Sequence, residues 1–255
     1  TGGDPAKTPF EVEGIVAPGI TEQQQRRRRE WLNELNTLRH AASNTPAMTA
    51  FARAENEAYD MILGGGAKLF DLSTEDEALR ERYGKNTFGQ SCLVARRLVE
   101  QGVPVITINY AGWDTHKNHF QSMRTKLPEL DQGMATLLQD LAGRGLLDST
   151  LVWWGGEFGR TPQIQWEAPY NGGRGHWGSV FSSVVAGGGF RGGQIVGSSD
   201  ARGETVQNRP VSPADLIASI YNRLGIEDHA LLPLPDGAGI PAAIPASNLL
   251  WEIMK

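Results

Sequence analysis

The sequence has few of the features that mark a disulfide scaffold, a membrane span or a polyanion-binding protein. Its single cysteine, Cys92, excludes an intrachain disulfide. No apolar run approaches the roughly 18 residues that a membrane helix needs. The net charge is only -5 at pH 7, so no general attraction draws the chain to nucleic acid. We therefore expect no nucleic-acid partner and no membrane span.

The chain also lacks an initiating methionine and a signal-like apolar stretch at its start. This favours a processed chain or a piece of a longer one. Residues 1–20 are rich in glycine and proline and are predicted to form an extended arm. The basic run at 23–30 lies in a helical pattern whose apolar side is Trp31, Leu32, Leu35 and Leu38, so we interpret it as a solvated helix face.

Residues 21–102 are predicted to be a helical segment, because helix-start and helix-stop signals recur along it. The signals are Thr21 with Gln24, Thr45 with Pro46, Ser73 with Asp76, and the stop at Gly84. Cys92 falls at helical spacing in 88–102. We therefore interpret Cys92 as a core thiol and not as a nucleophile.

From residue 103 the pattern changes to strands alternating with helices. Apolar stretches at 103–110, 149–156, 179–188 and 194–197 are predicted strands. Residues 119–145 return to helical spacing with Pro128 as a kink or break, and Ser212 with Pro213 starts a helix that Gly225 ends. This order predicts an α/β core at 103–255 with a mostly parallel sheet and an extended tail, and 21–255 as one domain.

Polar residues follow two of the predicted strands directly. The strand at 103–110 leads to Asp114 and His116, and the strand before Gly155 leads to Glu157. Loops at the carboxyl ends of parallel strands converge, so these side chains are expected at one rim. His176, with Arg174, precedes the strand at 179–188, so its loop must either turn back or precede an antiparallel strand.

Two carboxylates and two imidazoles on convergent loops are typical ligands of a divalent ion, with zinc, manganese and calcium all open by ligand type. Glu157 has an alternative, in which Arg160 or Arg174 neutralises it in an ion pair. His116 has one too, as a hydrogen-bonded loop histidine. His40 and His229 receive no role. The glycine-rich run 187–197 lacks the Lys-Ser/Thr ending of a phosphate loop and is interpreted as tight turns.

Four stretches, at 88–116, 155–162, 173–197 and 209–226, closely resemble the domain of unknown function 1501 family. These exported bacterial proteins are grouped with the alkaline phosphatase and sulfatase superfamily. The resemblance covers 2 to about 241 and implies an α/β/α sandwich with a mostly parallel sheet. It also implies that this chain lacks the amino-terminal portion and is exported, to the periplasm or beyond the cell.

The resemblance further implies metal ligands at Asp114, His116, Glu157 and His176. Phe158 stands where sulfatase-type enzymes carry a ligating histidine, and Gly175 replaces an aspartate that is usual in the family. Arg160 and Arg174 are candidates for binding an anionic group. The region of a phosphatase-like nucleophile would precede Thr1, so no catalytic residue is assigned.

Two functions follow as hypotheses. The first is a non-catalytic assembly or cell-envelope module with a structural metal site, partnered by its missing amino-terminal portion or by further copies. The second is a metal-dependent hydrolase of phosphate or sulfate esters in the full-length protein.

Overall fold

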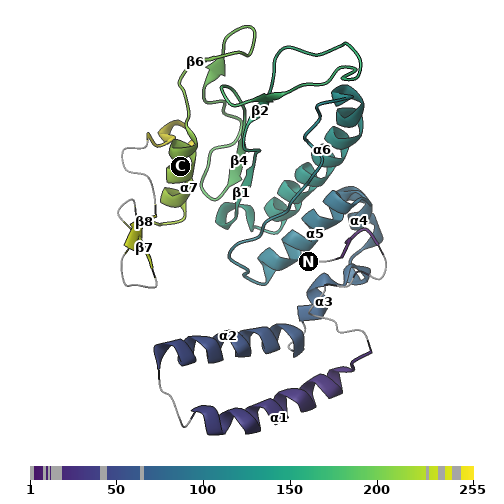
Figure 1. The fold of residues 1–255 in the computed structure, drawn as a ribbon, viewed down its shortest axis with the longest axis vertical. Helices are drawn as coiled ribbons and strands as arrows, with labels where there is room; N and C mark the ends of the chain where they lie inside the picture. The colour runs from purple at the N-terminus through teal and green to yellow at the C-terminus, as the bar shows by residue number, and fades with distance from the viewer. Residues whose placement is uncertain are drawn as a thin grey trace. The chain divides into compact units, whose positions relative to one another are not determined.

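The computed structural model describes residues 3–7, 10, 12, 19–40, 45–63, 66–227, 230–234, 239–242 and 248–255. Much of the predicted arm at 1–20 and His229 lie outside these residues. The described chain combines helices with small sheets and is a mixed α/β protein (Figure 1). It forms two compact units, one of 1–109 with 129–137 and one of 110–128 with 138–255.

The first unit is helical. Its elements are α1 (Glu22–His40), α2 (Pro46–Leu63), α3 (Gly66–Phe70), the 3-10 turn η1 (Leu72–Thr74), α4 (Glu77–Tyr83) and α5 (Thr87–Glu100). The long helix α6 (His119–Gly143) contributes its middle to this unit and its ends to the second.

The predicted helix starts are confirmed in part. Thr21 and Gln24 cap α1 reciprocally, as expected. Asp76 caps α4 by accepting from the Ala78 amide, but Ser73 lies in η1 instead, so the third helix starts at Asp76 rather than at Ser73. Gly84 ends α4.

The core of the first unit surrounds α5. Tyr83, Cys92 and Leu93 are fully buried, and Leu130 of α6 is buried in the same unit. The side chain of Cys92 is a free, buried thiol. Trp31, by contrast, is 64% exposed, so the apolar side predicted for α1 is not buried at this position.

The second unit holds all the strands that the described residues form. They are β1 (Leu151–Trp154), β2 (Gly159–Arg160), β3 (His176–Trp177), β4 (Val184–Gly187), β5 (Ser198–Ser199), β6 (Val206–Asn208), β7 (Leu231–Pro233) and β8 (Gly239–Pro241). The unit also contains the 3-10 turns η2 (Leu147–Ser149) and η3 (Trp251–Ile253), and α7 (Pro213–Arg223).

Each sheet in the described chain is a pair of antiparallel strands: β1–β4, β2–β3, β5–β6 and β7–β8. A mostly parallel sheet is not among them. Residues 103–110 form no strand, and neither do 194–197. The difference arises because a strand needs a partner, and apolar β-branched composition specifies the strand without specifying its partner.

The helices of the second unit agree more closely with the predictions from sequence than its strands do. Pro128 lies inside a continuous α6, so it does not split the helix. Ser212 and Asp215 form the capping box of α7, which ends just before Gly225. A core cluster of Phe190, Ile220, Leu250, Ile253 and Met254 packs α7 against the carboxyl-terminal turn.

Candidate metal centre

The centre is built on the short ladder of β2 and β3. These strands pair antiparallel, with Arg160 opposite His176 and Gly159 opposite Trp177. The sequence left open whether the loop with His176 turns back or precedes an antiparallel strand, and β4, which follows this loop, pairs antiparallel with β1. The chain between Arg160 and His176 forms a loop whose two ends lie side by side.

Asp114, His116 and His176 converge above this ladder. The Asp114 Oδ1 atom lies 2.9 Å from His176 Nε2 and 3.1 Å from His116 Nε2. The two imidazole Nε2 atoms lie 3.1 Å apart. In the part of the chain that the structure describes, these residues form the group of potential metal ligands, and all three are exposed. An ion could therefore reach them from solvent.

Arg160 forms an ion pair with the Asp114 carboxylate. Its Nη2 atom donates to Asp114 Oδ1 over 2.7 Å and to the Trp113 carbonyl over 2.8 Å. The contact with His176 and the hydrogen bond from Arg160 lower the pKa of the Asp114 carboxyl to about 2. The Asp114 carboxyl is consequently ionised throughout the neutral range.

Arg174 is the second candidate for binding an anion. Its Nε atom donates to the Thr161 carbonyl over 2.6 Å, and Nη2 donates to the Arg160 carbonyl over 3.3 Å. Burial, together with the charge of Arg160, lowers the pKa of Arg174. Both arginines thus direct several donors at the main chain and brace the loop.

A buried pair to which the sequence analysis gave no role is formed by residues close in the chain to Asp114 and His116. Thr115 Oγ1 and His119 Nδ1 are 2.6 Å apart, and both residues are buried. Burial first, and the nearby charges of Arg174 and Arg160 second, lower the pKa of His119. The sequence held one signal for this pair, because Thr115 and His119 are four residues apart where a helix was predicted to start. The pair anchors the turn between Asp114 and His116 to α6.

Two further contacts hold the loop against this turn. The Arg174 amide donates to the Thr115 carbonyl over 3.3 Å, and the Asn118 amide donates to the Tyr170 carbonyl over 3.0 Å. Gly173 approaches so closely that a Cβ atom there would lie 1.8 Å from the His116 carbonyl oxygen. A glycine is therefore required at this crossing.

Glu157 does not join the group. It lies in the bend before β2, is exposed, and makes no hydrogen bond or ion pair with any described residue. Arg160, which could have neutralised it, pairs with Asp114 instead. Phe158 packs its ring on that of His176, with centroids 4.3 Å apart. Phe158 thus packs on a candidate ligand and offers no ligand atom itself.

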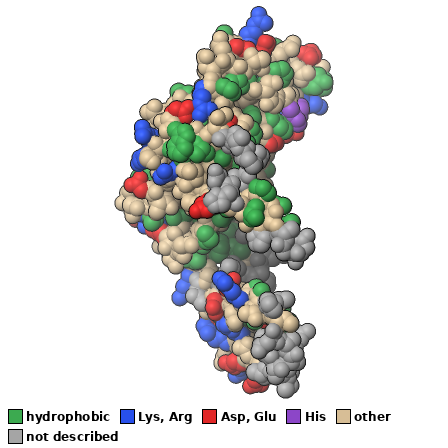
Figure 2. All heavy atoms as spheres, turned by 90° about the vertical axis from the view of Figure 1, so that its left-hand side faces the viewer, with side chains coloured by type: hydrophobic (Ala, Val, Ile, Leu, Met, Phe, Trp, Pro, Cys, Tyr) green, Lys and Arg blue, Asp and Glu red, His purple; other side chains and the backbone are tan. Residues whose placement is uncertain are grey.

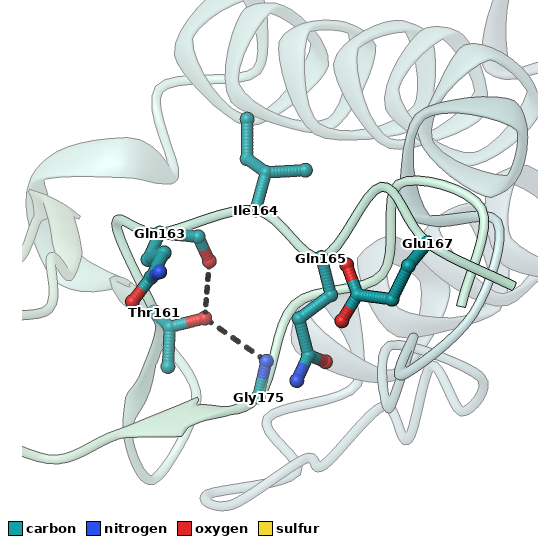
Figure 3. Close-up of a pocket in the computed structure, with 6 residues that line it drawn as sticks. All are labelled: Thr161, Gln163, Ile164, Gln165, Glu167 and Gly175. Carbon is teal, nitrogen blue, oxygen red and sulfur yellow. Dashed lines mark hydrogen bonds between the residues drawn. The ribbon is translucent and has the colours of Figure 1, made fainter. Parts of the chain in front are cut away.

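A pocket of ≈ 230 Å³ is lined by residues of the loop between Arg160 and His176 (Figure 3). Its lining begins at Thr161, next to Arg160, and ends at Gly175, next to His176. Thr161 Oγ1 accepts from the Gly175 amide over 3.0 Å and donates to the Gln163 carbonyl over 2.9 Å. The remaining lining side chains are Gln163, Ile164, Gln165 and Glu167.

The face shown in Figure 2 carries both Lys or Arg and Asp or Glu side chains, with several basic side chains close together in the lower part of the view. None of the helices in the described part of the chain has the length and hydropathy that a bilayer crossing requires.

Fold and site together define a mixed α/β protein with an exposed cluster of two histidines and one aspartate. Residues 5–252 match the family described as "Protein of unknown function (DUF1501)", and the chain belongs to this family. Comparison with curated proteins and with solved structures finds no match.

Proposed function

We propose that the chain is a metal-binding module that holds a divalent ion through Asp114, His116 and His176. The observation that carries the proposal is the spacing of the three ligand atoms, 2.9 to 3.1 Å from one another. Ligand atoms about 2.0–2.1 Å from a tetrahedral zinc ion lie roughly 3.3 Å apart. Only small movements would be needed to accommodate the ion.

The donor set favours some ions over others. Two imidazoles and one carboxylate suit zinc or manganese, whereas calcium prefers oxygen ligands alone. Ferrous iron also binds such a set. Three protein ligands leave further coordination positions open, and the exposure of all three residues is consistent with this.

Within this proposal the ion is structural, and the protein is an exported assembly or envelope module with a phosphatase- or sulfatase-like sandwich. The support for a non-catalytic role comes from individual residues around the site. By the resemblance to sulfatase-type enzymes, Phe158 stands where those carry a ligating histidine, and Glu157 is not in the group of potential ligands. Arg160 and Arg174 donate to main-chain carbonyls rather than pointing all their donors at an anion.

A metal-dependent ester hydrolase is the second candidate, and the pocket beside the centre favours it. Thr161 and Gly175, which line the pocket, are the chain neighbours of Arg160 and His176, and we propose that an ester would bind there. The ion, when bound, would polarise an ester oxygen. Arg160 would keep Asp114 ionised and in place.

Elemental analysis of the purified chain tests the first proposal. The chain is dialysed against zinc and then against buffer, beside Asp114→Asn and Glu157→Gln variants. We expect a near-stoichiometric ion in the parent and in Glu157→Gln, and its loss in Asp114→Asn. Circular dichroism confirms that each variant is folded. Equal zinc in the parent and in folded Asp114→Asn contradicts the proposal.

Turnover of an aryl phosphate and an aryl sulfate separates the two candidates. A structural ion predicts no hydrolysis by the zinc-loaded chain above the buffer rate. Hydrolysis that disappears in Asp114→Asn and survives in Glu157→Gln would establish the hydrolase instead.

A further inference from the structure

The pocket in the loop between Arg160 and His176 is lined mostly by polar side chains (Figure 3). The lining comprises one hydroxyl, two carboxamides, one carboxylate, one aliphatic side chain and a glycine: Thr161, Gln163, Gln165, Glu167, Ile164 and Gly175. None of these described lining residues is basic, and one is acidic. The lining therefore offers no positive charge to an anion.

Main-chain hydrogen bonds hold the loop in this shape. The Gln165 amide donates to the Gly173 carbonyl over 3.0 Å, and the Gln165 carbonyl accepts from the Gly172 amide over 2.8 Å. The Glu167 carbonyl accepts from the Tyr170 amide over 2.9 Å. The walls of the pocket are thus fixed by the main chain, and a largely pre-formed pocket is usual for small-molecule sites.

The side chains of Gln163, Gln165 and Glu167 take no part in holding the loop. They make no hydrogen bond or ion pair with any residue that the structure describes. Thr161 differs, because its hydroxyl donates to the Gln163 carbonyl over 2.9 Å. Two carboxamides and one carboxylate are consequently available to a ligand.

These three groups are matched by a ligand that both donates and accepts hydrogen bonds. Each carboxamide has two donors and an acceptor oxygen, whereas the Glu167 carboxylate only accepts. An ammonium ion would serve the carboxylate but none of the carboxamide donors, and an anion would be repelled by the carboxylate. A hydroxyl group donates and accepts, so a ligand with several hydroxyls matches all three side chains.

The size of the pocket narrows the choice further. Its ≈ 230 Å³ is less than the roughly 300–1,000 Å³ of pockets that take drug-sized ligands. One compact group fits such a volume better than a length of peptide, whose amides would also donate and accept.

An exposed aromatic ring comes from the same loop. Trp166 stands between Gln165 and Glu167 in the chain and is 66% exposed. Its ring stacks on that of Phe120, with centroids 5.6 Å apart and 9° between the planes. The stack holds the indole in place, and a flat apolar surface of this kind suits the C–H face of a sugar ring.

We propose that the pocket binds a monosaccharide unit through its hydroxyl groups. The hydroxyls donate to Glu167 and exchange hydrogen bonds with Gln163 and Gln165. The inference does not depend on the ion, because none of the three candidate metal ligands lines the pocket. Under the second candidate function, the saccharide would be the alcohol portion of the ester.

Saturation-transfer NMR with the methyl glycosides of glucose, galactose and mannose tests the proposal. The chain is first treated with a chelator, so that no ion contributes. The typical binding energy per non-hydrogen atom predicts a Kd of about 1 mM for a ligand of this size.

Three variants assign the binding to the pocket. Glu167→Ala should raise the Kd at least about tenfold, because a hydrogen bond to a charged group is lost, and Gln165→Ala should raise it about threefold. Gln207→Ala is the matched control, since it truncates an exposed glutamine of β6 outside the pocket, and it should bind as the parent does. Circular dichroism confirms that each variant is folded.

Inorganic sulfate and butylamine, at matched ionic strength, are the contrasting probes, and we expect neither to displace a bound glycoside. Displacement by sulfate would overturn the proposal in favour of an anion site, and displacement by butylamine in favour of a cation site. No glycoside binding by the parent, or equal binding by folded Glu167→Ala, would also overturn it. Because the ion is absent throughout, neither result bears on zinc binding at Asp114, His116 and His176.

Discussion

Gly173 and Gly175, on either side of Arg174, differ in the space that a side chain would have at each position. A Cβ atom at Gly173 would collide with the His116 carbonyl at 1.8 Å, whereas one at Gly175 would meet Thr161 Cγ2 at 3.4 Å, an ordinary contact. One position therefore sets where a ligand lies, and the other tolerates a side chain. At the residue scale, the centre depends on main-chain crossings as much as on its ligands.

The contrast gives a matched pair of variants. Gly173→Ala should push the His116 main chain away and lower zinc affinity at least about tenfold, the effect of a loss of roughly 1.4 kcal/mol. Gly175→Ala should bind zinc as the parent does. Competition with a chromophoric chelator measures both affinities. Equal affinities in the two variants would show that the crossing does not position His116.

Cys92 provides a second prediction at this scale. The thiol is fully buried, and burial raises its pKa to about 12. It should not react with Ellman's reagent at about pH 8 while the protein is folded, and should react once per chain in denaturant. Rapid labelling of the folded chain would contradict the interpretation of Cys92 as a core thiol.

At the scale of elements, α5 is tied to the turn before α4 by one carboxylate. Glu75 accepts from Arg96 over 2.6 Å and from Arg97 over 2.5 Å, and the Arg96 side chain is only 3% exposed. Burial alone would raise the pKa of Glu75, but the hydrogen bonds from both arginines outweigh it, and the pKa is lowered.

A lowered carboxyl pKa stabilises the fold above the unfolded-state pKa. The contribution is lost as the pH falls through the folded-state value. Glu75→Gln should therefore destabilise the chain at neutral pH, by about 3 kcal/mol for a broken buried pair. The difference should shrink as both proteins are acidified below about pH 4. Urea unfolding across this pH range measures it, and a constant difference would refute the assignment.

The elements also show which features the sequence could predict. The capping boxes at Thr21 and Ser212 depend on residues three apart, so sequence alone locates them. The pairing of β1 with β4 joins Leu151 to Gly187, and nothing in either strand specifies that partner or its direction. The predicted parallel sheet failed to appear among the described strands for this reason.

In the candidate site, too, some features could be predicted from the sequence and others could not. Asp114, His116 and His176 could be nominated because their residue types and loop positions fit a metal ion. Arg160 pairs with Asp114 and not with Glu157, which lies only three residues before it in the bend that precedes β2. Sequence patterns carry no information on which carboxylate pairs with Arg160.

At the scale of the whole molecule, the centre belongs to one of two compact units. Its candidate ligands come from 114–116 and from β3, both within the second unit. A ligand that binds only the folded state stabilises it by about 2.7 kcal/mol at a hundredfold excess over Kd. Zinc should therefore protect mainly the second unit from opening.

Hydrogen exchange measured by mass spectrometry checks this expectation. Zinc should slow exchange in peptides covering 113–119 and 160–177 and leave those from α1 and α2 unchanged. Asp114→Asn should remove the effect. Protection spread evenly over both units would mean that zinc acts elsewhere than at the three ligands.

The ladder of β2 and β3 has a consequence for engineering this protein. Because Arg160 and His176 are joined across it, the loop between them is closed at its base. Its residues 166–169 are exposed. New chain ends or an inserted reporter domain at this tip would leave both ligand-bearing segments tied together. The loop is thus a natural place to convert metal binding into an optical signal.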